Sequence, residues 1–360
     1  MKIESMHLTN FRNYAELSLS FGAGANVFYG ANGQGKTNII EALYFFCNGK
    51  SYRGAKDREV ILFGEKRAEL GASFLAGGRG QTVQIFLDDT KRVLLNGIGL
   101  ERLSELVGVL KAVIFTPEHL SLVKSGPGMR RQFLDAFLSS LYPVYFKSLM
   151  AYFKALKQKN AYLKSGTKDD AIFDIWNERL SEYAAVIASY RRRMLNALEP
   201  FARESMLELS GGKEQLALTY LPSVKEDADK KDAVYEALNL HKRRELEMRM
   251  CLIGPHRDDF LWTINQKSGK LYGSQGQQRS LVIALKIAES EVIKSLTGEY
   301  PVLLLDDITS ELDDARRSYL LEKIKGRQVF ITCTERVQNS MGADKRLYHI
   351  KNAQAFLEEW

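Results

Sequence analysis

Residues 30–37 read Gly-Ala-Asn-Gly-Gln-Gly-Lys-Thr, a complete G-x-x-x-x-G-K-[ST] phosphate-loop motif. An apolar run at 27–29 precedes the motif and predicts a buried strand, and an apolar run with helical spacing follows it. Glycines let successive backbone N–H groups turn inward around phosphate, and the start of the helix adds its positive dipole end. A glycine turn before a helix is the plainer alternative. The motif in this context predicts a nucleoside triphosphate site.

Two side chains of the motif have specific expected roles. Lys36 would bridge the β and γ phosphates of ATP and assist catalysis, and the Thr37 hydroxyl would bind Mg²⁺, a hard cation that prefers oxygen ligands. The residues expected to contact the nucleotide here are Gly30, Ala31, Asn32, Gly33, Gln34, Gly35, Lys36, Thr37 and Asn38.

The acidic half of such a site is predicted at residues 301–307, Pro-Val-Leu-Leu-Leu-Asp-Asp, whose apolar run is typical of a strand buried in a parallel sheet. Ligands of open α/β sheets bind at the carboxyl ends of the strands. Asp306 is therefore the expected second Mg²⁺ ligand, and Asp307 is the candidate that polarises the attacking water. Both acids could instead be turn residues.

Ser274 and Gly276 come just before a predicted amphipathic helix, so Ser274 can cap the helix while Gly276 lets a phosphate approach the backbone. The segment looks like a degenerate signature of the ABC-type ATPases. This likeness implies that Ser274, Gly276 and Gln277 complete the ATP site of a partner subunit, with Ser274 also serving catalysis. Residues 209–213, Leu-Ser-Gly-Gly-Lys, match the usual signature letters better, but a predicted strand follows them and indicates a turn.

Six phrases, in this order along almost the whole chain, closely resemble the RecF family: LTNFRNY at 8–14, GANGQGKT at 30–37, PEHLSLVKSGPGMRRQFLD at 117–135, GPHRDD at 254–259, SQGQQR at 274–279 and LLLDDITSELD at 303–313. The resemblance implies an α/β fold: an ABC-type, SMC-like P-loop ATPase head with a mixed sheet and an inserted, mostly helical lobe. It also implies an ATP-dependent homodimer that binds single- and double-stranded DNA and gap junctions. Recombination mediators such as RecR and RecO, and indirectly RecA, are the implied partners.

The resemblance also places Arg12 near the nucleotide, although a surface arginine after an edge strand fits the sequence equally well. Where transport ATPases of the ABC type carry a glutamate after the strand aspartate, this chain carries the shorter Asp307. No histidine follows the strand expected at 328–334, and Thr332 or Thr334 could replace it only in part. These departures predict a weak, slow ATPase. Glu118 is expected near the Q-loop position.

The net charge of +7 and the pI near 9.1 favour polyanionic partners. Between residues 122 and 164 a single acid, Asp135, accompanies eight basic residues: Lys124, Arg130, Arg131, Lys147, Lys154, Lys157, Lys159 and Lys164. Further basic clusters occur at 191–193 and 242–244. Any one cluster could be a solvated helix surface, but their concentration in one helical region predicts contact with the DNA backbone and a steep dependence of affinity on salt.

Residues 1–121 and 248–360 are expected to form the ATPase head, and residues 122–247 a basic, mostly helical lobe with a hairpin at 207–220. The three cysteines lack disulfide or zinc spacing. Neither a signal peptide nor a membrane span is visible, so a cytoplasmic protein without a membrane partner is expected. The main alternative is the ATP-hydrolysing subunit of a membrane transporter, which would share the P-loop and the acidic strand.

Overall fold

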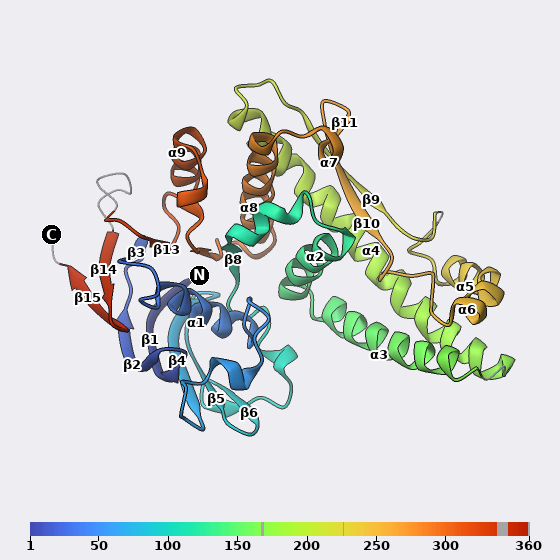
Figure 1. The fold of residues 1–360 in the computed structure, drawn as a ribbon, viewed down its shortest axis with the longest axis horizontal. Coiled ribbons are helices and arrows are strands. Elements are labelled where there is room, and N and C mark those ends of the chain that lie inside the picture. Colours follow the sequence, from blue (N-terminus) through green and yellow to red (C-terminus); the bar gives the residue numbers. More distant parts are fainter. Residues whose placement is uncertain (167–168, 226, 337–344, 359–360) are drawn as a thin grey trace. The chain divides into compact units, whose positions relative to one another are not determined.

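The computed structural model describes residues 1–166, 169–225, 227–336 and 345–358. The chain divides into two compact units, of which the first comprises Met1–Ser121 and Arg279–Trp360 and the second comprises Leu122–Gln278 (Figure 1). Both ends of the chain therefore build the first unit, as the sequence predicted.

A mixed six-stranded sheet carries the phosphate loop in the first unit. Its order is β15 (Gln354–Glu358), β14 (Lys345–Lys351), β3 (Ala25–Tyr29), β13 (Val329–Cys333), β12 (Val302–Leu305) and β8 (Ala112–Phe115). Only β15 runs antiparallel to its neighbour. All four residues of β12 are buried, as their continuous apolar pattern predicts. Because β13 separates β3 from β12, the loops that follow these two strands face each other across one strand.

The second sheet of this unit is antiparallel, in the order β2 (Tyr14–Ser20), β1 (Lys2–Phe11), β4 (Ala68–Ala76), β5 (Arg79–Leu87), β6 (Lys91–Leu95) and β7 (Ile98–Gly99). Burial alternates along β2 and β5, which is typical of strands with one face towards the core. Helix α1 (Lys36–Asn48) packs against strands of both sheets, which explains why most of its residues are buried.

Shorter helices complete the first unit: η1 (Asp57–Val60), η2 (Leu103–Glu105), η3 (Pro117–Leu122), η4 (Ile308–Glu311) and α9 (Asp314–Lys323). Helix α8 (Gln275–Thr297) begins at the end of the second unit and continues into the first. Its predicted apolar face is buried at Leu281, Leu285 and Val292, whereas Leu296 near its end is 53% exposed.

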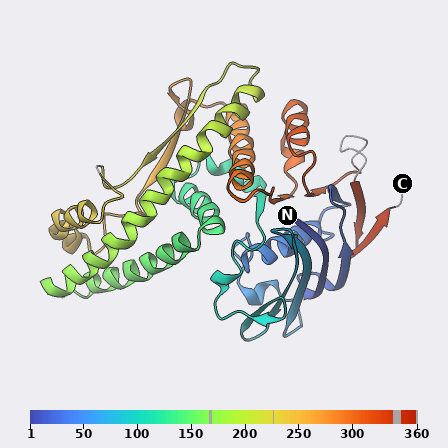
Figure 2. The same ribbon diagram turned by 180° about the vertical axis from the view of Figure 1, so that it is seen from behind.

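The second unit is mostly helical, with α2 (Pro127–Leu141), α3 (Pro143–Ser165), α4 (Asp170–Leu209), α5 (Lys231–Leu240), α6 (Lys242–Met248) and α7 (Gly269–Tyr272). Figures 1 and 2 show the long helix α4 lying beside α3. A three-stranded sheet, in the order β11 (Lys267–Ser268), β10 (Asp259–Ile264) and β9 (Leu216–Leu221), packs against α4. No helix in the described parts of either unit is long and apolar enough to cross a bilayer.

Two expectations about this unit were wrong. The hairpin predicted at 207–220 does not form, because α4 continues to Leu209 and the strand β9 pairs with β10, which lies about forty residues further along the chain. The pairing of β9 with β10 also shifts the boundary that was predicted between residues 247 and 248. Residues 248–278, predicted to belong to the ATPase head, belong to the second unit because β10 and β11 complete its sheet.

Candidate nucleotide-binding site

The phosphate loop follows β3, and its backbone requires glycine at two positions. Gly30 has φ +144°, and a Cβ there would lie 2.4 Å from the backbone oxygen of Ile350. Gly35 has φ +109°, and a Cβ there would lie 2.6 Å from the Asn13 amide. L side chains rarely adopt such φ values. Helix α1 starts at Lys36, inside the motif.

The Lys36 ammonium group folds back over the loop. It donates hydrogen bonds to the backbone oxygens of Gly30, at 2.7 Å, and Ala31, at 2.8 Å. A third donor hydrogen remains for a phosphate oxygen. Burial lowers the pKa of Lys36, and the nearby Asp307, Cys333 and Asp306 oppose this shift.

Asn13 and Asn352, to which the sequence analysis assigned no role, brace the loop. The Asn13 amide donates to the backbone oxygen of Gln34 at 3.2 Å and accepts from the Asn38 amide at 2.8 Å. From β14's side of the sheet, the backbone N–H of Asn352 donates to Gln34 Oε1 at 2.6 Å. Ala31, Asn32 and Gly33 remain exposed at the tip of the loop. The loop is thus fixed at its base and open where a ligand would enter.

Three hydroxyl groups donate to the Asp306 carboxylate at the end of β12. Thr37 and Thr332 each donate to Oδ1 at 2.9 Å, and Tyr52 donates to Oδ2 at 2.6 Å. Burial, followed by the charge of Asp306, raises the pKa of Tyr52, so its proton stays in place as a donor. The structure therefore brings together the predicted pair Thr37 and Asp306 and adds Tyr52, which the sequence analysis missed.

The donor set around Asp306 fits Mg²⁺, because carboxylate and hydroxyl oxygens suit this ion. In the described parts of the chain no three His, Cys, Asp or Glu residues cluster as a protein-only metal site. Mg²⁺ is usually held by one or two carboxylates plus substrate phosphates and waters.

Asp307 adopts a left-handed conformation, φ +50°, directly after Asp306. Its backbone N–H donates to Thr332 Oγ1 at 2.8 Å, so the Thr332 hydroxyl joins both aspartates. The Asp307 Oδ1 atom is buried and finds no hydrogen-bond donor within the described residues. A buried carboxylate oxygen without a protein donor is an acceptor for an ordered water. This position suits the predicted role of Asp307 towards water.

Arg12 lies at the turn between β1 and β2, and its guanidinium group is held by other residues. Its Nε and NH2 groups donate to the two Glu41 oxygens at 2.8 and 2.6 Å, and NH1 donates to the backbone oxygen of Glu59 at 2.9 Å. Glu41 is fully buried on α1. The arginine thus ties the antiparallel sheet to the helix that follows the phosphate loop, and three of its five N–H hydrogens have acceptors among the described residues.

The two candidate signatures differ in structure. Ser274 Oγ accepts from the Gln277 backbone N–H at 3.2 Å, while Gln277 Oε1 accepts from the Ser274 N–H at 2.8 Å, which is a capping box at the start of α8. Residues 210–212 instead end α4, where the Gly212 N–H donates to the Leu207 oxygen at 2.7 Å. The predicted cap and turn are both confirmed. Gly276 lies half-buried in the first turn of α8.

Glu118 begins the segment after β8, the strand beside β12. Thr116 donates to its carboxylate at 3.3 Å, and the Asp306 N–H donates to the Phe115 backbone oxygen at 2.9 Å. A Q-loop role for Glu118 stays a prediction. Among the two threonines considered as histidine substitutes, Thr332 contacts both aspartates, whereas Thr334 is exposed.

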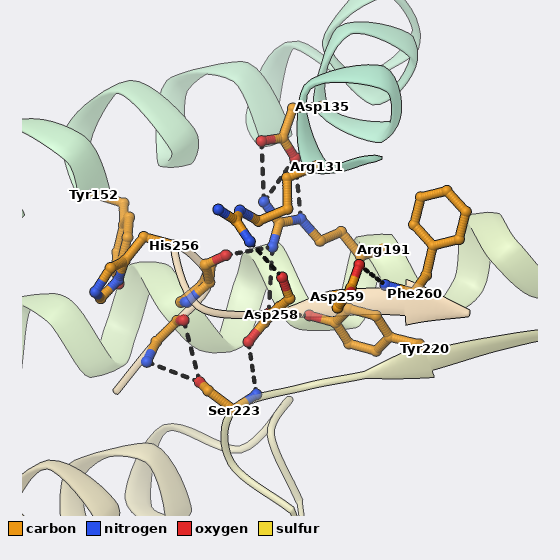
Figure 3. A network of polar contacts seen from close by, with 12 residues as sticks. Arg131, Asp135, Tyr152, Arg191, Tyr220, Ser223, His256, Asp258, Asp259 and Phe260 are labelled. Carbon is orange, nitrogen blue, oxygen red and sulfur yellow. Dashed lines mark hydrogen bonds and ion pairs between the residues drawn. The ribbon is translucent and has the colours of Figure 1, made fainter. Parts of the chain in front are cut away.

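Part of the predicted DNA-contacting charge is buried in the second unit. Arg191 on α4 donates to Asp135 at 2.8 Å and to Asp258 at 3.3 Å, and its side chain is 1% exposed (Figure 3). Arg130 pairs with Asp259 at 2.6 Å, again without exposure. These cations balance internal carboxylates, so the expectation that they meet DNA is wrong for them.

Lys159 is a third such cation: it pairs with Glu245 at 2.6 Å, with both side chains fully buried. The remaining charge on α3 is exposed. Lys147, Lys154, Lys157 and Lys164 recur at helical spacing, and no ion pair joins them to any described residue. On the opposite side of α3, Leu149, Tyr152 and Leu156 are buried, whereas Phe153 is 43% exposed. The exposed lysines form a stripe, here called the α3 stripe.

Comparisons with known proteins agree with this architecture. The RecF/RecN/SMC N terminal domain family matches residues 2–357. A protein of Clostridium perfringens named DNA replication and repair protein RecF is 38% identical over 356 residues, covering 98% of this chain and 99% of its own. The protein of the same name from Halalkalibacterium halodurans is 41% identical over 344 residues, covering 93% of each.

Among solved structures, one described as the recombination mediator protein RecF-ATP in the RecFOR pathway superposes with a TM-score of 0.92. Its sequence is 33% identical, and the match covers 99% of this chain and 98% of that one. An Smc head domain from Pyrococcus furiosus, 17% identical with a TM-score of 0.58, covers 99% and 96% and shows the shared fold alone. The predicted SMC-like ATPase fold is confirmed, and none of these relatives favours a transporter subunit. The chain belongs to the RecF family of DNA replication and repair proteins.

Proposed function

We propose that this chain is an ATP-dependent DNA-binding protein of recombinational repair and a weak ABC-type ATPase. ATP binding drives homodimerisation on gapped DNA or on junctions between single- and double-stranded DNA. Slow ATP hydrolysis then releases the protein from the DNA. The observation that carries the proposal is the Asp306 carboxylate at the end of β12, held by Thr37 of the phosphate-loop helix and by two further hydroxyls. The relative described as RecF-ATP supports the choice of nucleotide.

In this proposal the loop backbone and Lys36 bind the triphosphate, and Thr37 and Asp306 hold Mg²⁺. Bound Mg²⁺ would neutralise part of the phosphate charge. Asp307 accepts a hydrogen bond from the attacking water through its unpartnered Oδ1. Its side chain is one methylene shorter than glutamate and therefore reaches less far towards the phosphate. Hydrolysis is slow for this reason, and nucleotide occupancy acts mainly as a gate for assembly.

The dimer follows from the segment at the start of α8. Ser274, Gly276 and Gln277 lie where backbone N–H groups and the helix dipole favour phosphate, and in this proposal they complete the partner's ATP site. The α3 stripe supplies part of the DNA-backbone contact, since exposed lysines without protein partners are free to neutralise phosphates.

The protein partners we propose are RecR and RecO, with RecA loaded indirectly, because the RecF structure with a TM-score of 0.92 is described within the RecFOR pathway. Because the proposed substrate is gapped chromosomal DNA, the proposed location of the protein is the cytoplasm.

The test is the affinity for a labelled gapped duplex with and without Mg-ATP. The native chain is expected to bind more tightly with ATP, whereas Lys36→Met and Ser274→Arg lose this gain. Ser210→Arg is the matched control, since Ser210 lies at the end of α4. Replacing the four lysines of the α3 stripe with glutamine should flatten the salt dependence. ATP-independent binding in all chains would refute the proposal, and loss of the gain in Ser210→Arg alone would move the signature there.

A further inference from the structure

A groove in the second unit lies around the end of α6. It encloses about 410 Å³ and is lined by four apolar residues, Met248, Met250, Leu252 and Ile253, and by His241, Arg244 and Arg257. We refer to it as the α6 groove. The proposed function uses none of these seven residues, although the basic cluster noted in the sequence at 242–244 includes Arg244.

The floor of the α6 groove is rigid. Helix α6 ends at Arg249, which is left-handed with φ +54°, so the chain turns back immediately after Met248. The buried Glu245 carboxylate accepts from the Leu252 backbone N–H at 2.8 Å and pairs with Lys159 at 2.6 Å. These contacts fix the backbone on both sides of the two methionines.

Behind this segment lies the polar network of Figure 3. His256 donates from Nε2 to the Cys251 backbone oxygen at 3.1 Å and accepts at Nδ1 from the Tyr152 hydroxyl at 2.6 Å. The Asn160 side chain accepts from the Cys251 N–H at 2.7 Å. The backbone of the groove is therefore preformed, which lowers the conformational cost of binding.

The wall of the groove, by contrast, is adaptable and exposed. Met248 is 56% exposed and Met250 is 36% exposed. Methionine side chains are unbranched and polarizable, and they accommodate different apolar partners. Two exposed methionines that line one groove suit the insertion of an apolar side chain from another molecule.

The charged residues that line the groove are both arginines, Arg244 and Arg257. The Arg257 guanidinium group contacts the Met250 sulfur and the Cys251 backbone oxygen, and Arg249 lies between the two methionines in sequence. No ion pair joins Arg244, Arg249 or Arg257 to a carboxylate in the parts of the chain that the structure describes. Arginine guanidinium groups recognise carboxylates with paired donors. Within the described residues, the arginines at the rim of the α6 groove therefore have no carboxylate partners.

We infer that the α6 groove is a docking site for a peptide segment of a partner protein in which acidic residues flank an apolar side chain. The apolar side chain enters between Met248 and Met250, and the carboxylates meet Arg244 and Arg257. A nucleic acid fits less well, because phosphates would satisfy the arginines but leave the methionine wall without an apolar partner.

The experiment uses the full-length chain, immobilised, and a displayed library of random dodecapeptides. Enriched peptides are then titrated by fluorescence anisotropy against the native chain and against Arg244→Glu combined with Met250→Asp. Arg243→Glu is the matched control, because Arg243 precedes Arg244 on α6, is 94% exposed and does not line the groove. Circular dichroism melts check that each variant folds.

Enrichment of acidic peptides with an apolar residue, bound at least ten-fold more weakly by the groove variant and equally by Arg243→Glu, is the expected result. Enrichment of peptides without acidic residues, or equal binding by the native chain and the groove variant, would overturn the inference. A folded groove variant that loses affinity for a labelled oligonucleotide while still binding the peptides would assign the surface to nucleic acid instead.

Discussion

Asp306 shows how single hydroxyl groups can set the geometry of a carboxylate. Its two oxygens accept from Thr37, Thr332 and Tyr52, which come from α1, β13 and the segment after α1. Each donor favours the ionised carboxylate and fixes its plane. A metal-binding carboxylate that is held in this way has little freedom to rotate away from the site.

We predict that Tyr52→Phe lowers ATP hydrolysis roughly ten-fold while leaving nucleotide affinity nearly unchanged, because Tyr52 orients Asp306 without lining the phosphate loop. Single-turnover hydrolysis and equilibrium binding of a fluorescent ATP analogue measure the two effects. The control is Tyr44→Phe, since the Tyr44 ring packs on Tyr52 at 5.6 Å between centroids but donates no hydrogen bond to Asp306. Equal rates for the native chain and Tyr52→Phe would contradict this role.

His256 makes the second unit sensitive to acid. Burial, the largest cause, lowers the pKa of His256 to about 4, with Arg257 and Arg131 adding to the effect while the Cys251 backbone and Asp258 oppose it. The unfolded state therefore binds the proton more readily between pH 6.5 and 4, and stability falls as the pH falls through this range.

We therefore expect His256 to lower the free energy of unfolding of the native chain by about 2 kcal/mol when the pH is lowered from 7.5 to 5. This loss is measured by urea unfolding, monitored through the fluorescence of Trp262, which is buried in the same unit as His256. His256→Gln should show a pH dependence weaker by that amount. If both chains lost the same free energy on acidification, other groups would be responsible.

At this scale the sequence predicted the residues that belong to a contiguous motif. Lys36, Thr37 and Asp306 meet as expected because the phosphate loop has a fixed local geometry and β12 has a clear apolar pattern. Tyr52 and Asn13 could not be predicted, since their roles depend on contacts with segments distant in sequence. No local pattern marks such residues.

At the scale of elements, Arg191 joins three segments of the second unit. Its guanidinium group on α4 pairs with Asp135 on α2 and with Asp258 before β10, and it also donates to the Pro255 backbone oxygen at 2.8 Å. Although burial disfavours its charge, the surrounding acidic groups raise the pKa of Arg191 well above the ordinary value. The buried charges stabilise each other only while all of them are present.

Arg191→Met should therefore lower the free energy of unfolding by about 3–5 kcal/mol, because Asp135 and Asp258 would remain buried without their cation. Urea denaturation measures the loss. Arg192→Met is the matched control, since the neighbouring Arg192 forms an exposed pair with Asp229 and should change stability by less than about 1 kcal/mol. A similar small loss in both variants would mean that the network contributes little.

The same network explains an error of prediction. A basic residue in a helical segment looks the same in sequence whether it meets solvent or a buried carboxylate, and Arg130, Lys159 and Arg191 proved to be buried. The carboxylates that pair with Arg130 and Lys159 lie more than eighty residues away in sequence. Helical periodicity predicted α3 itself but could not supply these distant partners.

At the scale of the whole molecule, pairing between distant strands decides which residues belong to which unit. The apolar pattern predicted that both ends of the chain build one ATPase unit, and the parallel pairing of β3 with β13 and β14 accounts for this. The unit boundary after β10 and β11 was not predictable, because the partner of β9 could not be identified from local alternation.

The proposed dimer makes a prediction that a single chain cannot satisfy. If Lys36 of one chain and Ser274 of its partner serve the same ATP, Lys36→Met and Ser274→Arg each abolish both sites of their own homodimer. A mixed dimer of the two variants keeps one intact site, built from the phosphate loop of the Ser274→Arg chain and the signature of the Lys36→Met chain. About half of the native activity per mixed dimer should therefore return.

Differently tagged variants purified together by tandem affinity provide the mixed dimer, and ATP hydrolysis with gapped duplex provides the readout. Lys36→Met mixed with Ser210→Arg controls for mutation outside the signature. In that mixture the native signatures remain, so the Ser210→Arg chain should also support one working site. If the Lys36→Met and Ser274→Arg mixture stayed as inactive as either parent, each ATP site would have to use both residues from one chain. The proposal that each ATP site takes Lys36 from one subunit and Ser274 from the other would then be refuted.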